Sequence, residues 1–175
     1  MTNMHLKSIV LFFCTTLMGG LAHSLPASGS NYAVSSAHPL ATQAGVEILE
    51  QGGNAADAAT AVAFVLAVVE PYSSGLGGGG FALTQFKSNV EFLDFRETAP
   101  AALHRDYYLE EGNDSRRGAT AVGVPGTVAG LYAMHQKFGV LPWSEVVEPA
   151  YRLAREGFPV SPWLHDGITS SRDLL

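Results

Sequence analysis

The sequence predicts an α+β fold that occupies a single globular domain. Three observations favour it: two helical segments early in the chain, a pair of aromatic and β-branched runs in its middle, and further helical segments near its end. Of the 175 residues, 47% are hydrophobic and 15% are charged, as is typical of globular proteins rather than of disordered or collagen-like chains. The chain is therefore long enough for about one domain.

The N-terminal segment has the features of a signal peptide, which we expect to span residues 1–24. Lys7 precedes a mostly apolar stretch, and the small residues of GGLAHSLPA follow it. The apolar stretch is shorter than the ~20 residues of a membrane-spanning helix, so an uncleaved anchor is the less favoured alternative. Residues 25–175 would form the exported domain, in the periplasm or outside the cell, without Cys14, the only cysteine of the sequence.

Composition also limits the partners of the exported domain. Without the leader it carries 9 basic and 16 acidic residues, a net charge of −7, and its one basic cluster is Arg116–Arg117. This balance argues against nucleic acid or an anionic membrane surface as a partner. The histidines show no metal-binding spacing such as H-E-x-x-H, so we expect neither a metal nor a cofactor.

A short strand and two helices are predicted first. The strand is expected in YAVSSAH, residues 32–38. Pro39 then stands at a first helical position, and apolar residues recur at helical spacing as far as the next glycine pair. Asn54 is suited to cap a second helix, and Asp57 places a negative charge in its first turn. Because this helix is apolar on every face over residues 58–69, we expect it to be buried between layers.

Four consecutive glycines follow in YSSGLGGGGFALTQF, residues 72–86. Gly75, Gly77 and Gly80 match the G-x-G-x-x-G spacing of a dinucleotide-binding loop. Such a loop must follow a strand and open a helix, because the helix N-terminus binds the pyrophosphate. Here a helix enters the glycines and a strand leaves them, so a nucleotide is not expected. Two interpretations remain, which are a tight crossing between a helix layer and a sheet, or the floor of a pocket.

A β-hairpin and two more helices are predicted beyond the glycines. The runs FALTQF and VEFLDF, residues 81–86 and 90–95, are separated by KSN and are typical of two antiparallel strands. Residues 110–118 are polar and are expected to form an exposed loop. VPGTVAGLYAMHQKFG and PWSEVVEPAYRLAREG each have proline near the start and glycine at the end, as helices do. Pro149 is expected to bend the second of these helices.

Arg96 has the strongest chemical signal in the sequence. It follows a predicted strand directly and lies between Asp94 and Glu97 in FLDFRETAPAA. A guanidinium held at the end of a sheet could bind a substrate carboxylate through two parallel hydrogen bonds. A structural ion pair with Asp94 or Glu97 is the alternative. A serine nucleophile has no support, because G-x-S-x-G and S-x-x-K motifs are absent.

Three segments resemble the N-terminal part of the large subunit of γ-glutamyltransferase, also called glutathione hydrolase. The first covers residues 37–83, from AHPLATQAGVEILEQGGNAAD to GGGGFAL. The second is DFRETAP at residues 94–100. The third covers residues 123–160, from GVPGTVAGLYAMHQKFG to REGFPV. Together they cover essentially the whole expected domain. The resemblance implies a partial N-terminal nucleophile hydrolase fold, an αββα sandwich in which two stacked sheets lie between helical layers. It also implies export, in agreement with the leader.

The same resemblance implies a reaction and a substrate. In that family a precursor cleaves itself, and the threonine that begins the small subunit attacks the γ-amide of glutathione or a related γ-glutamyl compound. Water, an amino acid or a peptide then releases the acyl group. Arg96 is implied to bind the α-carboxylate of the γ-glutamyl group, and Glu97 to position Arg96. The small subunit of the same precursor is the implied partner.

This sequence lacks the family's Thr-Thr-His type segment, which lies several hundred residues into the precursor. Its only Thr-Thr pair, at residues 15–16, falls in the leader. We therefore expect a fragment of a γ-glutamyltransferase, with an incomplete core and no activity by itself. A β-lactam acylase-type relative and a truncated, non-catalytic secreted binding protein are the alternatives that the residues leave open.

Overall fold

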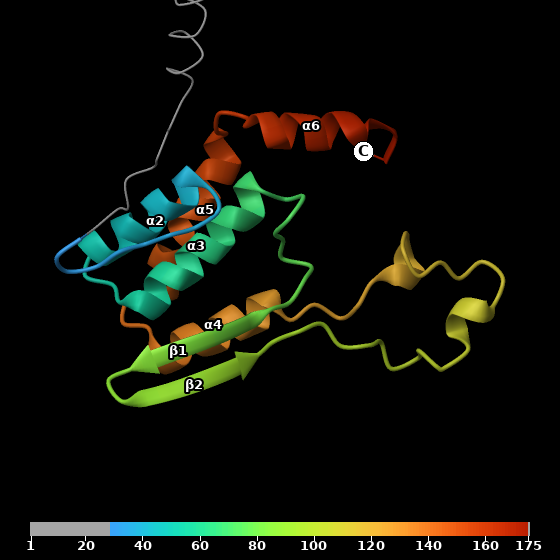
Figure 1. Cartoon of the computed structure of the whole chain (residues 1–175), viewed down its shortest axis with the longest axis horizontal. Helices are drawn as coiled ribbons and strands as arrows, with labels where there is room; N and C mark the ends of the chain where they lie inside the picture. Colours follow the sequence, from blue (N-terminus) through green and yellow to red (C-terminus); the bar gives the residue numbers. More distant parts are fainter. Residues whose placement is uncertain (1–28, 175) are drawn as a thin grey trace, which may run out of the picture. The chain divides into compact units, whose positions relative to one another are not determined.

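The computed structural model describes residues 29–174, and its contacts separate the chain up to Ala33 from a compact unit that begins at Val34. The expected signal peptide at residues 1–24 lies outside the described residues. The helices and strands, labelled in Figure 1, are α2 (Pro39–Glu50), α3 (Ala55–Val69), β1 (Phe81–Phe86), β2 (Asn89–Asp94), α4 (Thr127–Phe138), α5 (Trp143–Glu156) and α6 (Pro162–Ser170). No helix among the described residues has the length and apolarity that crossing a membrane requires.

The segment before α2 is irregular, so the strand predicted over residues 32–38 is wrong. None of its residues pairs with a strand in the described part of the chain. Its polar side chains bind the start of α2 instead. The Ser36 hydroxyl donates to the His38 carbonyl oxygen at 3.0 Å, and the His38 Nδ1 accepts from the Leu40 N–H at 3.2 Å. Pro39 is the first helical residue, as predicted.

α3 is capped as the sequence predicts, by reciprocal hydrogen bonds at its N-terminus. The Asn54 side-chain oxygen accepts from the Ala56 N–H at 2.8 Å, and the Asp57 carboxylate accepts from the Asn54 N–H at 2.9 Å. The helix packs against α2, α4 and α5 (Figure 1). Within residues 58–69, which were predicted to be buried on every face, burial is confirmed for Ala58, Thr60, Ala61, Phe64, Val65 and Val69. Val62, Ala63, Leu66, Ala67 and Val68 are half-buried, so the helix is not buried on every face. The small side chain of Ala59 is exposed on the remaining face.

β1 and β2 form the predicted hairpin, antiparallel, with Phe81 opposite Asp94 and Phe86 opposite Asn89. The turn is shorter than KSN because Asn89 joins β2, and Lys87 takes a left-handed conformation with a φ of 57°. One face of the hairpin packs toward the core, where the rings of Phe86 and Phe138 stack 4.7 Å apart. The large apolar side chains exposed on the other face are Phe81, Leu83, Val90 and Phe92.

α4 and α5 form where the sequence places them, and α5 continues through Pro149. Pro149 and its neighbour Val146 are buried, and α5 packs against α3. Arg152 joins α5 to α2 through a 2.9 Å hydrogen bond to Glu47 and also bonds to Glu148 on its own helix at 2.6 Å. The hydrogen bond to Glu47 raises the pKa of the Arg152 guanidinium.

Two further features complete the second half of the unit. α6 was not predicted, although its start carries a local signal: Ser161 caps it by accepting from the Leu164 N–H at 3.1 Å. The exposed loop predicted over residues 110–118 is confirmed, with only Asn113 half-buried. The Asn113 side chain donates to the Tyr107 carbonyl oxygen at 2.8 Å, which gives the loop a local anchor.

Candidate substrate-binding site

Arg96 and Glu97 lie just beyond β2, in a segment whose backbone is fixed by neighbouring groups. Gly80 and Phe95 exchange two backbone hydrogen bonds of 3.3 and 3.0 Å, so the hairpin ladder continues past the ends of both strands. The Asp94 carboxylate accepts from the Arg96 N–H at 3.0 Å. Asp94 therefore shapes the backbone turn. Of the two ion pairs considered from the sequence, the one with Glu97 is formed.

The glycine loop crosses this segment at very short range. A Cβ atom on Gly79 would lie 2.6 Å from the Phe95 carbonyl oxygen and 2.7 Å from the Glu97 nitrogen, so no larger residue fits without a shift. The Gly78 carbonyl oxygen accepts from the Gly126 N–H at 2.9 Å, which joins the loop to the start of α4. The predicted side-chain-free crossing is thus confirmed at Gly79.

The Arg96 guanidinium is held at one edge and on one face. Its Nε lies 3.3 Å from Glu97 Oε2, and its Cζ lies 5.9 Å from the centre of the Phe81 ring. That ring stacks on Phe92, with ring centres 5.4 Å apart. Within residues 29–174 no other hydrogen bond or ion pair of this guanidinium is found, and the side chain is 57% exposed. Both Nη groups can therefore donate in parallel to a carboxylate.

Glu97 is the more buried member of the pair, at 30% side-chain exposure. Its Oε2 atom is shielded from solvent and accepts no hydrogen bond from any described residue. A buried carboxylate oxygen without a donor is costly unless a nearby charge compensates it. Arg96 supplies that charge, so the two side chains depend on each other for their placement.

A pocket of about 810 Å³ opens beside the pair. α3, the glycine loop, β1 and the start of α4 contribute to its wall, and a pocket of this size suits a small molecule. Both interpretations of the glycines are therefore confirmed, since the crossing also forms part of the pocket wall. Its lining includes Gly75, Gly78, Gly79, Arg96, Glu97 and Thr127.

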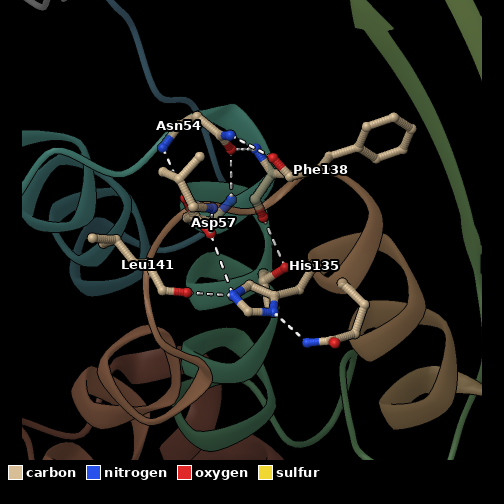
Figure 2. A network of polar contacts seen from close by, with 9 residues as sticks. Asn54, Asp57, His135, Phe138 and Leu141 are labelled. Atoms are coloured by element: carbon tan, nitrogen blue, oxygen red, sulfur yellow. Dashed lines mark hydrogen bonds and ion pairs between the residues drawn. The ribbon is translucent and has the colours of Figure 1, made fainter.

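A second polar cluster joins the start of α3 to the end of α4, and Figure 2 shows its members. The fully buried Asp57 carboxylate accepts from the N–H groups of Asn54 and Val140, at 2.9 and 3.1 Å. The His135 Nε2 lies 3.4 Å from Asp57 Oδ1 and 2.9 Å from the Leu141 carbonyl oxygen. Because a carbonyl oxygen only accepts, this nitrogen carries a proton.

The polar cluster is structural, because its groups bind one another and the local backbone. The Asn54 Nδ2 donates to the Phe138 carbonyl oxygen at 2.5 Å, and Gly139 packs too closely on Asp57 to carry a side chain. The cap was predicted from the sequence, but His135 was not. It is far from Asp57 along the chain, so no local sequence signal connects the two residues. Among residues 29–174, no three potential metal ligands are grouped together.

Solved structures identify the class of protein. γ-Glutamyltranspeptidase from Helicobacter pylori superposes on 85% of this chain and 44% of its own, with a TM-score of 0.81 and 39% sequence identity. Cephalosporin acylase from Bacillus halodurans superposes on 86% of this chain and 30% of its own, with a TM-score of 0.75 and 34% identity. The chain therefore has an α+β fold that is part of the N-terminal nucleophile hydrolase fold, as predicted.

Sequence similarity then identifies the family. Residues 41–175 match the family described as Gamma-glutamyltranspeptidase. The glutathione hydrolase proenzyme of Escherichia coli (strain K12) is 49% identical over 141 residues, covering 77% of this chain and 24% of that protein. The chain belongs to the γ-glutamyltranspeptidase family and corresponds to the N-terminal part of its large subunit. It spans about a quarter of the length of the curated relatives it matches.

Proposed function

We propose that this chain is the N-terminal portion of an exported γ-glutamyltransferase, or glutathione hydrolase, and that Arg96 binds the α-carboxylate of its substrate. The observation that carries the proposal is the placement of the guanidinium. Glu97 holds its Nε edge and Phe81 lies against its face, while both Nη groups stay open within residues 29–174, beside a pocket. A guanidinium oriented in this way is pre-organised for two parallel hydrogen bonds to a carboxylate.

Glu97 is proposed to position Arg96 and not to contact the substrate. Its Oε2 is shielded from solvent and lies 3.3 Å from the Nε of Arg96, which leaves the Nη groups for the substrate. Removing this carboxylate would free the guanidinium to change rotamer, since the cation–π contact with Phe81 restrains only one face. A positioning role predicts weaker substrate binding in Glu97→Gln with a smaller effect on the chemical step.

The reaction itself would need a further part of the precursor. A threonine at the start of the small subunit would attack the γ-amide carbon of glutathione or another γ-glutamyl compound, and the amine would leave with a proton. Water, an amino acid or a peptide would then release the γ-glutamyl group from the threonine oxygen. The relatives called glutathione hydrolase and proenzyme support this assignment. This chain by itself is proposed to be inactive.

Export is proposed from the leader pattern and from the family resemblance. Residues 1–24 would be removed, and the domain at 25–175 would function in the periplasm or outside the cell. N-terminal sequencing of the secreted protein would test this, and a mature protein that still begins at Met1 would contradict it.

A β-lactam acylase is a second candidate, favoured by the similarity to the cephalosporin acylase structure. The two candidates differ in what the substrate presents to Arg96. A γ-glutamyl group carries a free α-carboxylate next to its amine, whereas a simple acyl side chain does not. Faster release of the acyl group from a cephalosporin than of a γ-glutamyl anilide would favour the acylase.

The test of the proposed function places this chain in a complete enzyme. Residues 29–175 would replace the matching region of the E. coli proenzyme, and release of a γ-glutamyl anilide would be measured. Arg96→Ala is expected to lower kcat/KM by about 30-fold to several thousand-fold, the equivalent of about 2–5 kcal/mol. Arg105→Ala is the matched control, because Arg105 is exposed and does not line the pocket.

Wild-type kcat/KM in the Arg96→Ala chimera would refute the binding role. Anilide release by the purified 175-residue chain would contradict its proposed inactivity and would favour a catalytic group within this sequence.

A further inference from the structure

Phe95, the residue before Arg96, is approached so closely by four glycines that a side chain on any of them would press against it. A Cβ atom on Gly80 would lie 3.0 Å from the Phe95 ring, and one on Gly130 would overlap the Cβ and Cγ atoms of Phe95. On the backbone side, a Cβ atom on Gly79 would lie 2.6 Å from the Phe95 carbonyl oxygen, and one on Gly126 would overlap that oxygen. These four residues form a glycine cage around Phe95.

The glycine cage joins two segments that are far apart in the sequence. Gly79 and Gly80 belong to the glycine loop, whereas Gly126 is the N-cap of α4 and Gly130 is buried within that helix. Glycine is unfavourable inside a helix compared with alanine, so Gly130 lowers the intrinsic stability of α4. Apart from the backbone of α4, the three atoms nearest to a Cβ on Gly130 all belong to Phe95. The ring of Phe95 is therefore the reason that this helical position requires a glycine.

The glycine cage also fixes the peptide group that joins Phe95 to Arg96. The oxygen of this group is confined by Gly79 and Gly126, and its N–H donates to the Asp94 carboxylate at 3.0 Å. Because a peptide group is planar, holding its oxygen and its N–H fixes the orientation of the whole unit. The Arg96 Cα belongs to the same plane, so the point from which the Arg96 side chain departs is fixed as well.

Phe95 lies beside the candidate site and outside the apolar core. It is half-buried and lines the pocket together with Arg96 and Glu97. Neither of the two apolar clusters formed by the described residues includes it. Core packing therefore does not account for the enclosure of this ring, whereas a fixed backbone at Arg96 does.

We propose that Phe95 is a positioning residue for the binding of the substrate carboxylate. The glycine cage holds its ring and its carbonyl oxygen, and the peptide group that follows carries this constraint to Arg96. α4 also packs on β2 (Figure 1), so the position of α4 sets the backbone from which the guanidinium reaches the pocket. The inference rests on the proposed function, in which Arg96 binds the α-carboxylate of a γ-glutamyl group.

The test uses the chimera with the E. coli proenzyme, with release of a γ-glutamyl anilide as the measurement. Gly130→Ala adds a Cβ atom that would force the Phe95 ring out of the glycine cage. Gly167→Ala is the matched control, because Gly167 lies within α6 and a Cβ there makes ordinary contacts of 3.7–3.9 Å with Tyr72. Both changes replace a helical glycine by alanine, so they raise helix propensity alike. Phe95→Ala is the second variant, and it removes the ring without adding an atom.

Gly130→Ala and Phe95→Ala are each expected to raise KM about tenfold or more while kcat falls less than about threefold, because a misplaced binding group weakens substrate binding. Gly167→Ala should leave KM within about twofold. In the Arg96→Ala background, Phe95→Ala should raise KM less than about twofold further, since the group that it positions is absent. A loss of folding would instead lower kcat alike in both backgrounds.

A measurement on the 175-residue chain decides the question if a variant chimera does not mature. The Arg96 amide hydrogen should exchange about tenfold faster in Phe95→Ala than in the wild type, because its peptide group is no longer held. Gly167→Ala should show wild-type exchange at this amide.

Four results would overturn the proposal. They are a wild-type KM in Phe95→Ala while Arg96→Ala is impaired, equal KM increases for Gly130→Ala and Gly167→Ala, a KM increase by Phe95→Ala that is as large in the Arg96→Ala background, or unchanged exchange of the Arg96 amide in Phe95→Ala. A wild-type kcat/KM in Arg96→Ala would instead refute the proposed function, so the two failures give different patterns.

Discussion

Replacing Asp57 with asparagine should destabilise the chain by about 2–4 kcal/mol. The carboxylate is fully buried, accepts from the N–H groups of Asn54 and Val140, and lies 3.4 Å from the His135 Nε2. An asparagine amide keeps one acceptor oxygen and places an NH₂ group where a donor already points. Each buried N–H that loses its acceptor costs about 1–3 kcal/mol, and one or two are affected.

Urea unfolding of the chain, followed by circular dichroism, measures this loss. The midpoint should fall while the m value stays unchanged, since the surface exposed on unfolding is the same. Asp166→Asn is the matched control, because that carboxylate is 77% exposed and, among residues 29–174, pairs only with the exposed His165. It should change the free energy of unfolding by less than about 0.5 kcal/mol. An Asp57→Asn midpoint equal to that of the wild type would refute the reasoning.

Two backbone predictions concern the glycine loop and the hairpin turn. Gly79→Ala should cost about 1–3 kcal/mol, because its Cβ would meet backbone atoms of Phe95 and Glu97, whereas Gly77→Ala has open space and should cost less. Thermal unfolding of the two variants measures the difference, and equal midpoints would disprove the crossing. Lys87→Gly should stabilise the chain by about 0.5–1 kcal/mol by relieving the left-handed φ of 57°. A lower midpoint than that of the wild type would contradict this expectation.

Local sequence signals were sufficient to predict the structural features that depend on residues close together in the chain. The cap of α3 joins Asn54 to Asp57 within a single turn, and Pro39 begins α2, so both could be predicted from spacing. The strand expected over residues 32–38 failed because a strand needs a partner, and the sequence cannot show whether one is present. Ser36 of that segment instead donates to the carbonyl oxygen of His38, the N-cap of α2.

The polar cluster around Asp57 could not be predicted from the sequence, because tertiary structure brings its members together. The sequence predicted the Asp57 charge only as favourable for the helix dipole, but the carboxylate also accepts a hydrogen bond from the Val140 N–H and lies 3.4 Å from the His135 Nε2. These residues approach Asp57 only when α4 packs against α3. Periodicity identifies a buried helix, but it does not specify which groups meet at its ends.

The sequence by itself determined the element order around the glycines, which excluded a phosphate-binding loop, and it marked Arg96 as a candidate for carboxylate binding. Only the tertiary structure decided that Asp94 shapes the backbone while Glu97 pairs with the guanidinium, and that Phe81 lies against its face. The physical reason is that neighbours in sequence do not fix side-chain direction. The crossing at Gly79 and the hairpin register do so, because they set where the backbone of Phe95 runs.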